Sequence, residues 1–179
     1  MYIVMITGSP HKNGTSALLA DEFIKGAEES GHSVFRFNTA FDCVHPCIGC
    51  DSCQCGDKPC VFQDDMNFLY PELKKADMII FVSPLYYHCL SAQIKIAIDR
   101  FHGIDNALIG TNKKAMLLMT AASNVESIYN GALGSYHETV KYLGWNDSGV
   151  LLAYGCSTRA DIEKTDYPKK AYELGRAVK

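Results

Sequence analysis

The fold is decided by YIVMITGSPHKNGTS, residues 2–16, in which a short apolar run leads straight into a loop of glycine, hydroxyl and amide residues. The run is nearly continuous in apolar character, which is typical of a strand covered on both faces. After the loop, Leu19, Phe23 and Ala27 recur at helical spacing, which predicts a helix with one buried face. A strand, a polar loop and a helix in this order predict the first unit of an α/β fold.

The same alternation continues outward from this unit through the rest of the chain. Four further apolar runs predict strands at residues 33–37, 78–82, 114–119 and 149–154. The first of these runs alternates apolar and polar residues and therefore predicts an edge strand. Helical spacing follows the other three runs, in segments that begin after Ser91, near Ile128 and at Tyr167. Strands that alternate with helices predict a doubly wound parallel sheet with helices on both faces, and we expect residues 1–179 to form one domain.

Composition and charge exclude several classes of protein. The 179 residues carry 17 basic and 20 acidic side chains, for a formal net charge of −3, and the one dense basic group is Lys169 with Lys170. We therefore expect no nucleic-acid partner and no membrane surface as partner. The apolar run at the N-terminus is too short for a signal peptide or a membrane span, so a cytoplasmic, reducing location is expected. In such a location a group of cysteines indicates metal or redox chemistry rather than disulfides.

The loop at residues 8–16 lies where parallel sheets bind phosphate, between the end of a strand and the start of a helix. Five residues separate Gly8 from Gly14, so the loop is neither a Walker loop nor a GxGxxG dinucleotide loop. Its hydrogen-bond donors are Ser9, Asn13, Thr15 and Ser16, and its cations are His11 and Lys12. These groups suit a monophosphate. The alternative is a plain strand-to-helix turn that is capped by Asn13 or Thr15.

Two more loops are expected at the same edge of the sheet. SPLYYHCL, residues 83–90, offers Pro84 for a turn and the flat faces of Tyr86 and Tyr87, which suit a planar ring. The alternative is that one tyrosine packs between helix and sheet. TAASN, residues 120–124, consists of small residues that let the backbone approach a ligand closely. Three loops at one edge would meet at the topological switch point, where open α/β sheets bind ligands.

Three parts of the chain, in this order, resemble the flavodoxin-like NAD(P)H-dependent FMN reductase family, including its iron–sulfur flavoprotein branch. They are GSPHKNGTS, PCIGCDSC followed by CVFQDDM, and SPLYYHCLSAQIKIAIDR. The resemblance covers most of the chain and implies a five-stranded sheet of order 2-1-3-4-5. It implies that FMN phosphate binds at Ser9, His11, Asn13, Gly14, Thr15 and Ser16. It implies that the flavin ring binds at Pro84, Leu85, Tyr86, Tyr87, Thr120 and Ala121. The family commonly has arginine at position 11, whereas the charge of a histidine there depends on its protonation.

The resemblance also implies a function. The chain is expected to be an FMN-dependent oxidoreductase that takes a hydride from NAD(P)H and passes electrons to a second acceptor, such as free flavin or a quinone. The flavin carries the chemistry, so no catalytic side chain is expected. A homodimer is implied as well. Two alternatives stay open, namely an iron–sulfur flavoprotein that transfers electrons between protein partners and a non-enzymatic, thiol- or metal-responsive binding module.

The cysteines of HPCIGCDSCQCGDKPC, residues 45–60, have more than one interpretation. Four of them share the spacing CxxCxxC, six residues, then Cys, namely Cys47, Cys50, Cys53 and Cys60. The first three match the tight spacing of loops that wrap a cubane. A metal-free loop with redox-sensitive thiols, a [4Fe–4S] cluster and a zinc ion all remain open. Cys43 and Cys55 fall outside this quartet, and Cys89 and Cys156 are predicted to be small buried residues.

Four single features are predicted to be structural. Pro71 interrupts an apolar helical pattern, which predicts a helix that begins near Pro71 or is kinked there. Asp99 and Arg100 are expected to form an ion pair on a helix surface or at an interface. His88 is expected to fill a turn. Trp145 is expected to pack after the fourth helix.

Overall fold

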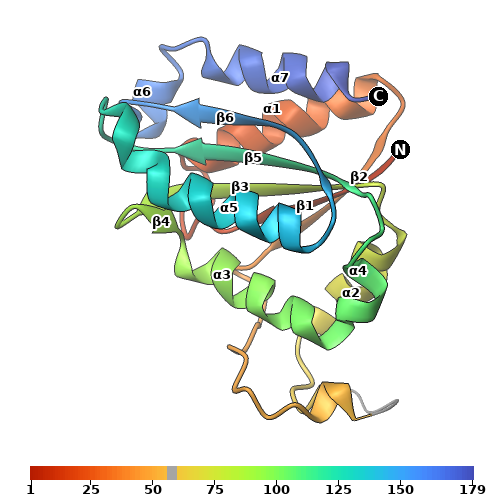
Figure 1. The fold of residues 1–179 in the computed structure, drawn as a ribbon. Coiled ribbons are helices and arrows are strands. Elements are labelled where there is room, and N and C mark those ends of the chain that lie inside the picture. Colours follow the sequence, from red (N-terminus) through yellow and green to blue (C-terminus); the bar gives the residue numbers. More distant parts are fainter. Residues whose placement is uncertain (56–59) are drawn as a thin grey trace.

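The computed structural model describes residues 1–55 and 60–179 (Figure 1). Its strands are β1 (Tyr2–Thr7), β2 (Ser33–Asn38), β3 (Met78–Tyr86), β4 (Cys89–Leu90), β5 (Lys114–Thr120) and β6 (Asn146–Ala153). Its α-helices are α1 (Thr15–Glu29), α2 (Met66–Lys75), α3 (Ala92–Asp99), α4 (Asp105–Leu108), α5 (Asn130–Tyr142), α6 (Arg159–Ile162) and α7 (Tyr167–Ala177). Its 3₁₀ turns are η1 (Ser52–Gln54), η2 (Arg100–Ile104) and η3 (Glu126–Tyr129). None of the helices in the described ranges is long and apolar enough to cross a membrane.

The long strands form one parallel sheet in the order β2-β1-β3-β5-β6, and β4 pairs antiparallel with the end of β3. Strand β1 pairs on both sides, so that Ile3 lies opposite Val34 of β2 and Met78 of β3. Counted without the short β4, this order is 2-1-3-4-5. The predicted flavodoxin-like sheet is confirmed, and β2 lies at the edge as its alternating pattern predicts.

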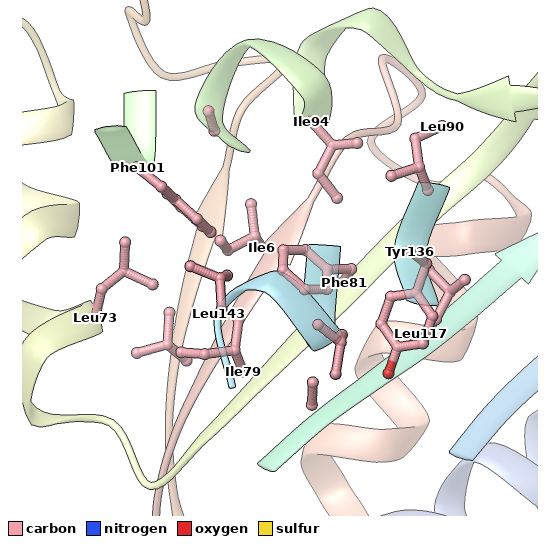
Figure 2. Close-up of a cluster of buried hydrophobic side chains, with 14 of the residues drawn as sticks. Ile6, Leu73, Ile79, Phe81, Leu90, Ile94, Phe101, Leu117, Tyr136 and Leu143 are labelled. Atoms are coloured by element: carbon pink, nitrogen blue, oxygen red, sulfur yellow. The ribbon is translucent and has the colours of Figure 1, made fainter. Parts of the chain in front are cut away.

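Helices cover both faces of the sheet, and each face has its own core. Helices α1, α6 and α7 cover one face, whereas α2, α3, α4 and α5 cover the other. Successive strand residues point to opposite faces, so Ile3 enters the core under α1 and α7 while Val4 enters the other core. Figure 2 shows this second core, in which Phe81 packs against Phe101 and Tyr136.

Helices α1 and α7 touch through glycines. A methyl group at Gly26 on α1 would fall onto the carbonyl oxygen of Tyr172, and a methyl group at Gly175 on α7 would fall onto that of Phe23. Any side chain at either position would therefore meet backbone atoms, which cannot turn aside as a side-chain end can. The contact holds the last helix against the helix that follows the first loop of the sheet.

Helix α2 begins earlier than the sequence indicates. It starts at Met66 and holds Pro71 in its interior, so the first of the two predicted alternatives, a start near Pro71, is wrong, and the second, a helix kinked at Pro71, stays a prediction. The start is fixed by Asp64, whose Oδ1 accepts a hydrogen bond from the Met66 N–H at 3.2 Å. Met66 and Leu73 are fully buried, and their packing offsets the backbone hydrogen bond that Pro71 cannot make.

Strand β6 also begins earlier, at Asn146 instead of Gly149. The Asn146 N–H donates to the carbonyl of Lys113 at 2.8 Å, which extends the pairing with β5. Just before this strand, Trp145 is buried and its indole Nε1–H donates to the carbonyl of Leu108 at 2.9 Å. The predicted structural role of Trp145 is confirmed.

Candidate functional site

A cavity of about 710 Å³ opens at the C-terminal ends of the parallel strands. Its walls come from the segments that follow β1, β3, β5 and β6. The predicted site residues that line it are Ser9, His11, Asn13, Gly14, Thr15, Pro84, Leu85, Tyr86, Thr120 and Ala121. We call it the edge cavity. Its volume lies within the range of roughly 300–1,000 Å³ that is usual for cofactor and small-molecule sites.

The segment after β1 leaves backbone donors unpaired at the start of helix α1. Two backbone hydrogen bonds of His11 hold this segment in a compact loop. The His11 N–H donates to Ser9 Oγ at 3.2 Å, and the His11 carbonyl accepts from the Gly14 N–H at 3.1 Å. Helix α1 has no side-chain cap, and within the described residues its first three N–H groups have no acceptor. The predicted alternative, a turn capped by Asn13 or Thr15, is therefore wrong. Unpaired N–H groups at the positive end of a helix dipole are suited to a phosphate.

Ser16 lies behind the wall of the edge cavity. Its side chain is buried, and its Oγ is 2.9 Å from Oγ1 of Thr120, which is also 3.0 Å from Oγ1 of Thr15. These three hydroxyl groups join the segment after β1 to the segment after β5. The Ser16 hydroxyl is buried behind the wall, which leaves its backbone N–H as the group that Ser16 offers to a phosphate. Thr15 lines the cavity, so its hydroxyl can turn from Thr120 toward a phosphate.

The segment after β3 is a two-residue hairpin turn that separates the two predicted tyrosines. Tyr87 and His88 form the turn with φ values of 47° and 63°, the left-handed conformation that tight hairpins favour. His88 therefore fills a turn, as predicted. Tyr86 lines the edge cavity, whereas Tyr87 is 99% exposed and lies outside the lining. Cys89 follows the turn and is exposed, so its predicted burial is wrong, because short β4 leaves one side open to solvent.

The segment after β6 forms a fourth wall that the sequence prediction missed. Its lining residues are Cys156, Ser157, Thr158 and Arg159. A capping box holds the segment at the start of α6, because Thr158 Oγ1 accepts from the Asp161 N–H at 3.3 Å and the Asp161 carboxylate accepts from the Thr158 N–H at 2.8 Å. Cys156 is buried as predicted, and burial raises the pKa of its thiol. The signal for this wall was available, because all parallel strands end at one edge of the sheet.

The lining of the edge cavity combines the two kinds of surface that FMN needs. Uncapped N–H groups at the start of α1 border it, and the lining includes the cations Lys12 and Arg159. Pro84, Leu85 and Tyr86 add an apolar wall with one aromatic face. Polar groups suit a phosphate, and an apolar wall suits a planar ring.

The four cysteines of the predicted quartet line a second cavity, and they are Cys47, Cys50, Cys53 and Cys60. We call it the cysteine pocket. Among the described residues, no three His, Cys, Asp or Glu side chains lie close enough to share one metal ion. The thiolates of a cubane bind separate iron atoms, so they stand farther apart than the ligands of a single zinc ion. Among the described residues, the quartet is therefore not arranged around a single ion.

Cys50 is chemically distinct within the quartet. Hydrogen bonds from the backbone N–H and the side chain of Ser52 lower the pKa of the Cys50 thiol from its ordinary value. The thiolate is the form that binds metal. The two cysteines outside the quartet, Cys43 and Cys55, are exposed and do not line the pocket.

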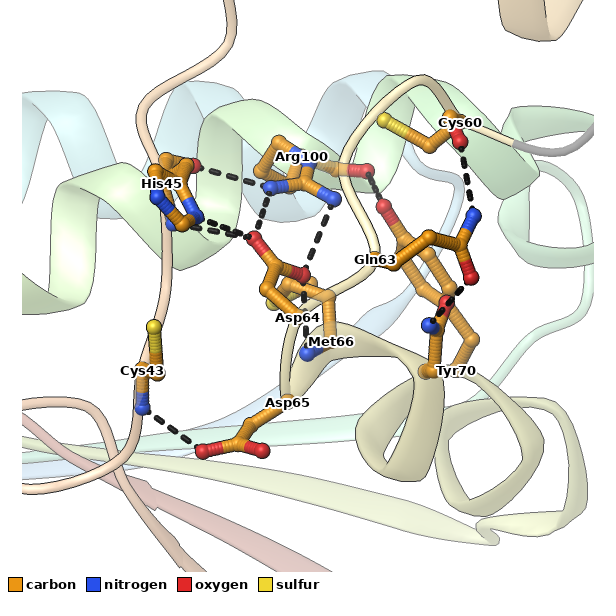
Figure 3. Close-up of polar contacts among 10 residues, drawn as sticks. Cys43, His45, Cys60, Gln63, Asp64, Asp65, Met66, Tyr70 and Arg100 are labelled. Atoms are coloured by element: carbon orange, nitrogen blue, oxygen red, sulfur yellow. Dashed lines mark hydrogen bonds and ion pairs between the residues drawn. The ribbon is translucent and has the colours of Figure 1, made fainter.

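The cysteine segment, which runs from Cys43 to Asp65, forms hydrogen bonds at its base and at its tip. At the base, Cys43 donates its N–H to Asp65 Oδ2 at 2.7 Å (Figure 3), and the Asp65 N–H donates to the Cys43 carbonyl at 2.9 Å. At the tip, Gln54 Nε2 donates to the carbonyl of His102 in η2 at 2.7 Å. Figure 1 shows that the segment projects from the side of α2 and α3, away from the sheet.

A buried ion pair joins the cysteine segment to η2 (Figure 3). Arg100 donates to both carboxylate oxygens of Asp64, at 2.7 Å and 3.2 Å, and to the carbonyl of His45 at 2.9 Å. The Arg100 and Asp64 side chains are 2% and 0% exposed. The predicted pairing of Arg100 with Asp99 is wrong, because Asp99 pairs with Lys95 on the surface of α3. The partner of Arg100 lies far away in the sequence, which helical spacing does not reveal.

The pair remains ionised despite its burial. Burial disfavours the charged carboxylate of Asp64. Hydrogen bonds from Arg100 and from the N–H groups of His45 and Met66, together with the Arg100 charge, outweigh burial and hold the pKa of this carboxyl below its usual range. One group stays unsatisfied, since Nε of Arg100 is buried and has no hydrogen-bond partner among the described residues.

Comparison with known sequences places these features in a family context. Residues 1–132 match the family model described as NADPH-dependent FMN reductase. An iron–sulfur flavoprotein of Archaeoglobus fulgidus is 28% identical over 180 residues, which cover 99% of this chain and 79% of that protein. An iron–sulfur flavoprotein of Methanocaldococcus jannaschii is 36% identical over 100 residues, which cover 56% of this chain and 51% of that protein. The matched part thus spans about half the length of the second relative.

Solved structures share the fold at low sequence identity. The NAD(P)H:quinone oxidoreductase of Methanothermobacter marburgensis superposes with a TM-score of 0.78 at 17% identity, over 98% of this chain and 94% of that one. An FMN-dependent NADH-azoreductase of Bacillus anthracis, solved in complex with FMN, gives a TM-score of 0.70 at 14% identity, over 99% and 97% of the two chains. Both likenesses establish the flavodoxin-like architecture.

Proposed function

Because the chain belongs to the NADPH-dependent FMN reductase family, we propose that it is an oxidoreductase that binds FMN in the edge cavity, oxidises NAD(P)H and passes the electrons to a second acceptor. The observation that carries this proposal is the uncapped start of α1, which opens into a cavity with an apolar far wall. Membership of an enzyme family speaks against the alternative of a non-enzymatic binding module.

The proposal gives each wall of the edge cavity a role toward FMN. The loop from Ser9 to Thr15 and the backbone N–H of Ser16 hold the phosphate, with His11 as a further donor. Pro84 to Tyr86 hold the ring on one side, and Thr120 with Ala121 approach it from β5. Tyr87 is too exposed to share this role within one chain. In the proposed homodimer, this side chain is free to contact a second copy.

The protein positions the cofactor and does not supply an acid or base. When bound, FMN supplies the hydride and electron chemistry of this enzyme class. The chain's own residues bind the phosphate, orient the ring and leave one side of it open to the nicotinamide. Residues 1–179 form one FMN-binding domain in this proposal, since both cores lie on a single sheet.

A second candidate function rests on the cysteine pocket. We propose that Cys47, Cys50, Cys53 and Cys60 hold a [4Fe–4S] cluster, because all four line one cavity and the relatives with matching sequences are named iron–sulfur flavoproteins. When bound, such a cluster supplies one-electron transfer. The chain would then pass single electrons between the flavin and a protein partner.

We expect Ser9→Ala combined with Thr15→Ala to weaken FMN binding by about 1–3 kcal/mol, because two hydroxyl donors to a charged phosphate are lost. The measurement is a fluorescence titration of apoprotein with FMN. The matched control is Ser135→Ala, which removes an exposed hydroxyl on α5, away from the edge cavity. An affinity of the double variant equal to that of the control would place the phosphate elsewhere.

FMN-loaded protein that is mixed with NADPH or NADH in the absence of oxygen is expected to lose its visible flavin absorbance. Stopped-flow absorbance measures the rate with each nucleotide. Free FMN at the same concentration is the control for direct reaction in solution. If neither nucleotide bleaches bound flavin faster than free flavin, the chain does not oxidise nicotinamides, although it can still bind FMN.

A further inference from the structure

We infer that Arg100 is a positioning residue for the cluster proposed for the cysteine pocket, and that its fixed positive charge raises the reduction potential of that cluster. The inference rests on the second candidate function given above. It concerns a side chain outside the cysteine quartet, to which neither the sequence pattern nor the family comparison assigns a role.

Arg100 belongs to the pocket and Asp64 does not. Arg100 lines the cysteine pocket together with the quartet, Phe62 and Tyr70, whereas Asp64 is absent from the lining. Arg100 is therefore part of the pocket wall, and its carboxylate partner is not. Although the pair is neutral as a whole, its positive member is the one at the wall.

Neighbouring residues hold Arg100 in this place. Its carbonyl accepts a hydrogen bond from the Tyr70 hydroxyl at 3.0 Å, and its guanidinium carbon lies 5.3 Å from the centre of the Phe62 ring. The Phe62 ring also stacks on the His45 ring at 4.8 Å. With 2% of its side chain exposed, Arg100 acts through protein and not through screening solvent.

One hydrogen bond of Arg100 is still available. Its Nε is one of two buried side-chain polar atoms without a partner in the described residues, and the other is Oε1 of Gln93 on α3. A buried donor without a partner is unfavourable unless a ligand satisfies it. The proposed cluster would supply an acceptor next to Arg100, because its sulfur atoms can accept hydrogen bonds.

The positive charge of Arg100 is expected to raise the reduction potential of a nearby cluster. Net charge, hydrogen bonds to sulfur and solvent exposure set the potential of an iron–sulfur cluster. Reduction adds one electron to a cluster that four thiolates already make anionic. A nearby positive charge and an N–H donor favour the reduced form more than the oxidised form. Dithionite supplies that electron in the experiment below, and no bond is formed or broken in the protein.

The test is a redox titration of the reconstituted cluster in the full-length protein, monitored by electron paramagnetic resonance. We expect Arg100→Gln to lower the ratio of reduced to oxidised cluster about tenfold at a fixed potential, which equals a shift of about 59 mV to more negative potential for a one-electron couple. Arg176→Gln is the matched control, because Arg176 lies in the last turn of α7, on the opposite face of the sheet. The FMN potential in the same sample is an internal reference.

Two further variants separate charge from packing. Asp64→Asn leaves the Arg100 charge without its counterion and is expected to shift the potential in the positive direction, opposite to Arg100→Gln. Arg100→Lys keeps the charge and is expected to restore most of the native potential. If Arg100→Gln does not hold the cluster, these two variants still show whether the Arg100 charge sets its reduction potential. If Arg100 had a purely structural role, the reduction potential of the cluster would shift in the same direction in all three variants.

The outcomes for the inference and for its premise are distinct. If the native chain binds no iron and sulfide, both the cluster and the role of Arg100 are wrong. If the native chain binds the cluster but Arg100→Gln and Asp64→Asn leave its potential unchanged, the cluster stands and the inference is overturned. Shifts of opposite sign support it.

Discussion

Anaerobically purified protein is expected to carry iron and acid-labile sulfide in equal amounts, about four of each per chain for a cubane, and Cys50→Ser is expected to reduce both to background. The reason lies in the cysteine pocket, where Cys50 is one of four lining thiols and the one whose pKa the Ser52 hydrogen bonds lower. Loss of one strong thiolate ligand leaves an iron atom of the cluster open to solvent. Iron is measured by a chelator assay and sulfide by methylene blue formation.

Cys55→Ser is the matched control for this experiment. Cys55 lies in the same segment, but it is exposed and does not line the pocket. This variant should therefore bind as much iron and sulfide as the native chain. Equal loss from both variants would show that the segment merely needs its thiols to fold. Stoichiometric zinc in place of iron would overturn the cluster and make the segment a structural metal site.

Gly26→Ala is expected to lower the free energy of unfolding by about 3 kcal/mol. The added methyl group would meet the Tyr172 carbonyl and, at 3.0 Å, the Arg176 N–H. Because both obstacles are backbone atoms of α7, the helices must separate along their length. Chemical denaturation followed by circular dichroism measures the change.

Gly134→Ala provides a control of the same chemical size. Gly134 lies on α5 and is exposed, and a methyl group at this position would have open space around it out to 4 Å. Alanine there should raise the free energy of unfolding by about 0.5–1 kcal/mol, because it restricts the unfolded chain without a clash. If Gly26→Ala were as stable as Gly134→Ala, the close contact between α1 and α7 would not exist in solution.

Short, continuous apolar runs in the sequence predicted the strands of the sheet well. A strand in a parallel sheet needs apolar residues on both faces, so runs such as residues 78–82 stand out without any knowledge of their neighbours. Pro71 shows the limit of local rules. Its penalty in a helix is a few kcal/mol, and the burial of Met66 and Leu73 against the sheet is large enough to offset it. Such packing depends on distant parts of the chain.

For the candidate site too, some features follow from the local sequence and others depend on distant parts of the chain. The place of the loop after β1 could be predicted because it follows from the strand before it. The side chains of Ser16 and Tyr87 lie outside the lining of the edge cavity, since the Ser16 hydroxyl faces Thr120 and the Tyr87 ring is displaced by a turn of two residues. Arg100 resembles a surface cation in the sequence because its partner Asp64 lies 36 positions away. Sequence spacing predicts which residues share an element, and tertiary contacts decide what each side chain meets.

The closed base of the cysteine segment bears on how the protein matures. Cys43 and Asp65 join the two ends of the segment, so the sheet does not need the residues between them for its own strand pairing. We expect a newly made chain to fold and load flavin before any iron is delivered. Oxygen that strips the iron would then leave a flavoprotein ready for repair. In cells, the balance between iron-free and iron-loaded forms would follow iron supply and aeration, with no need to make the chain anew.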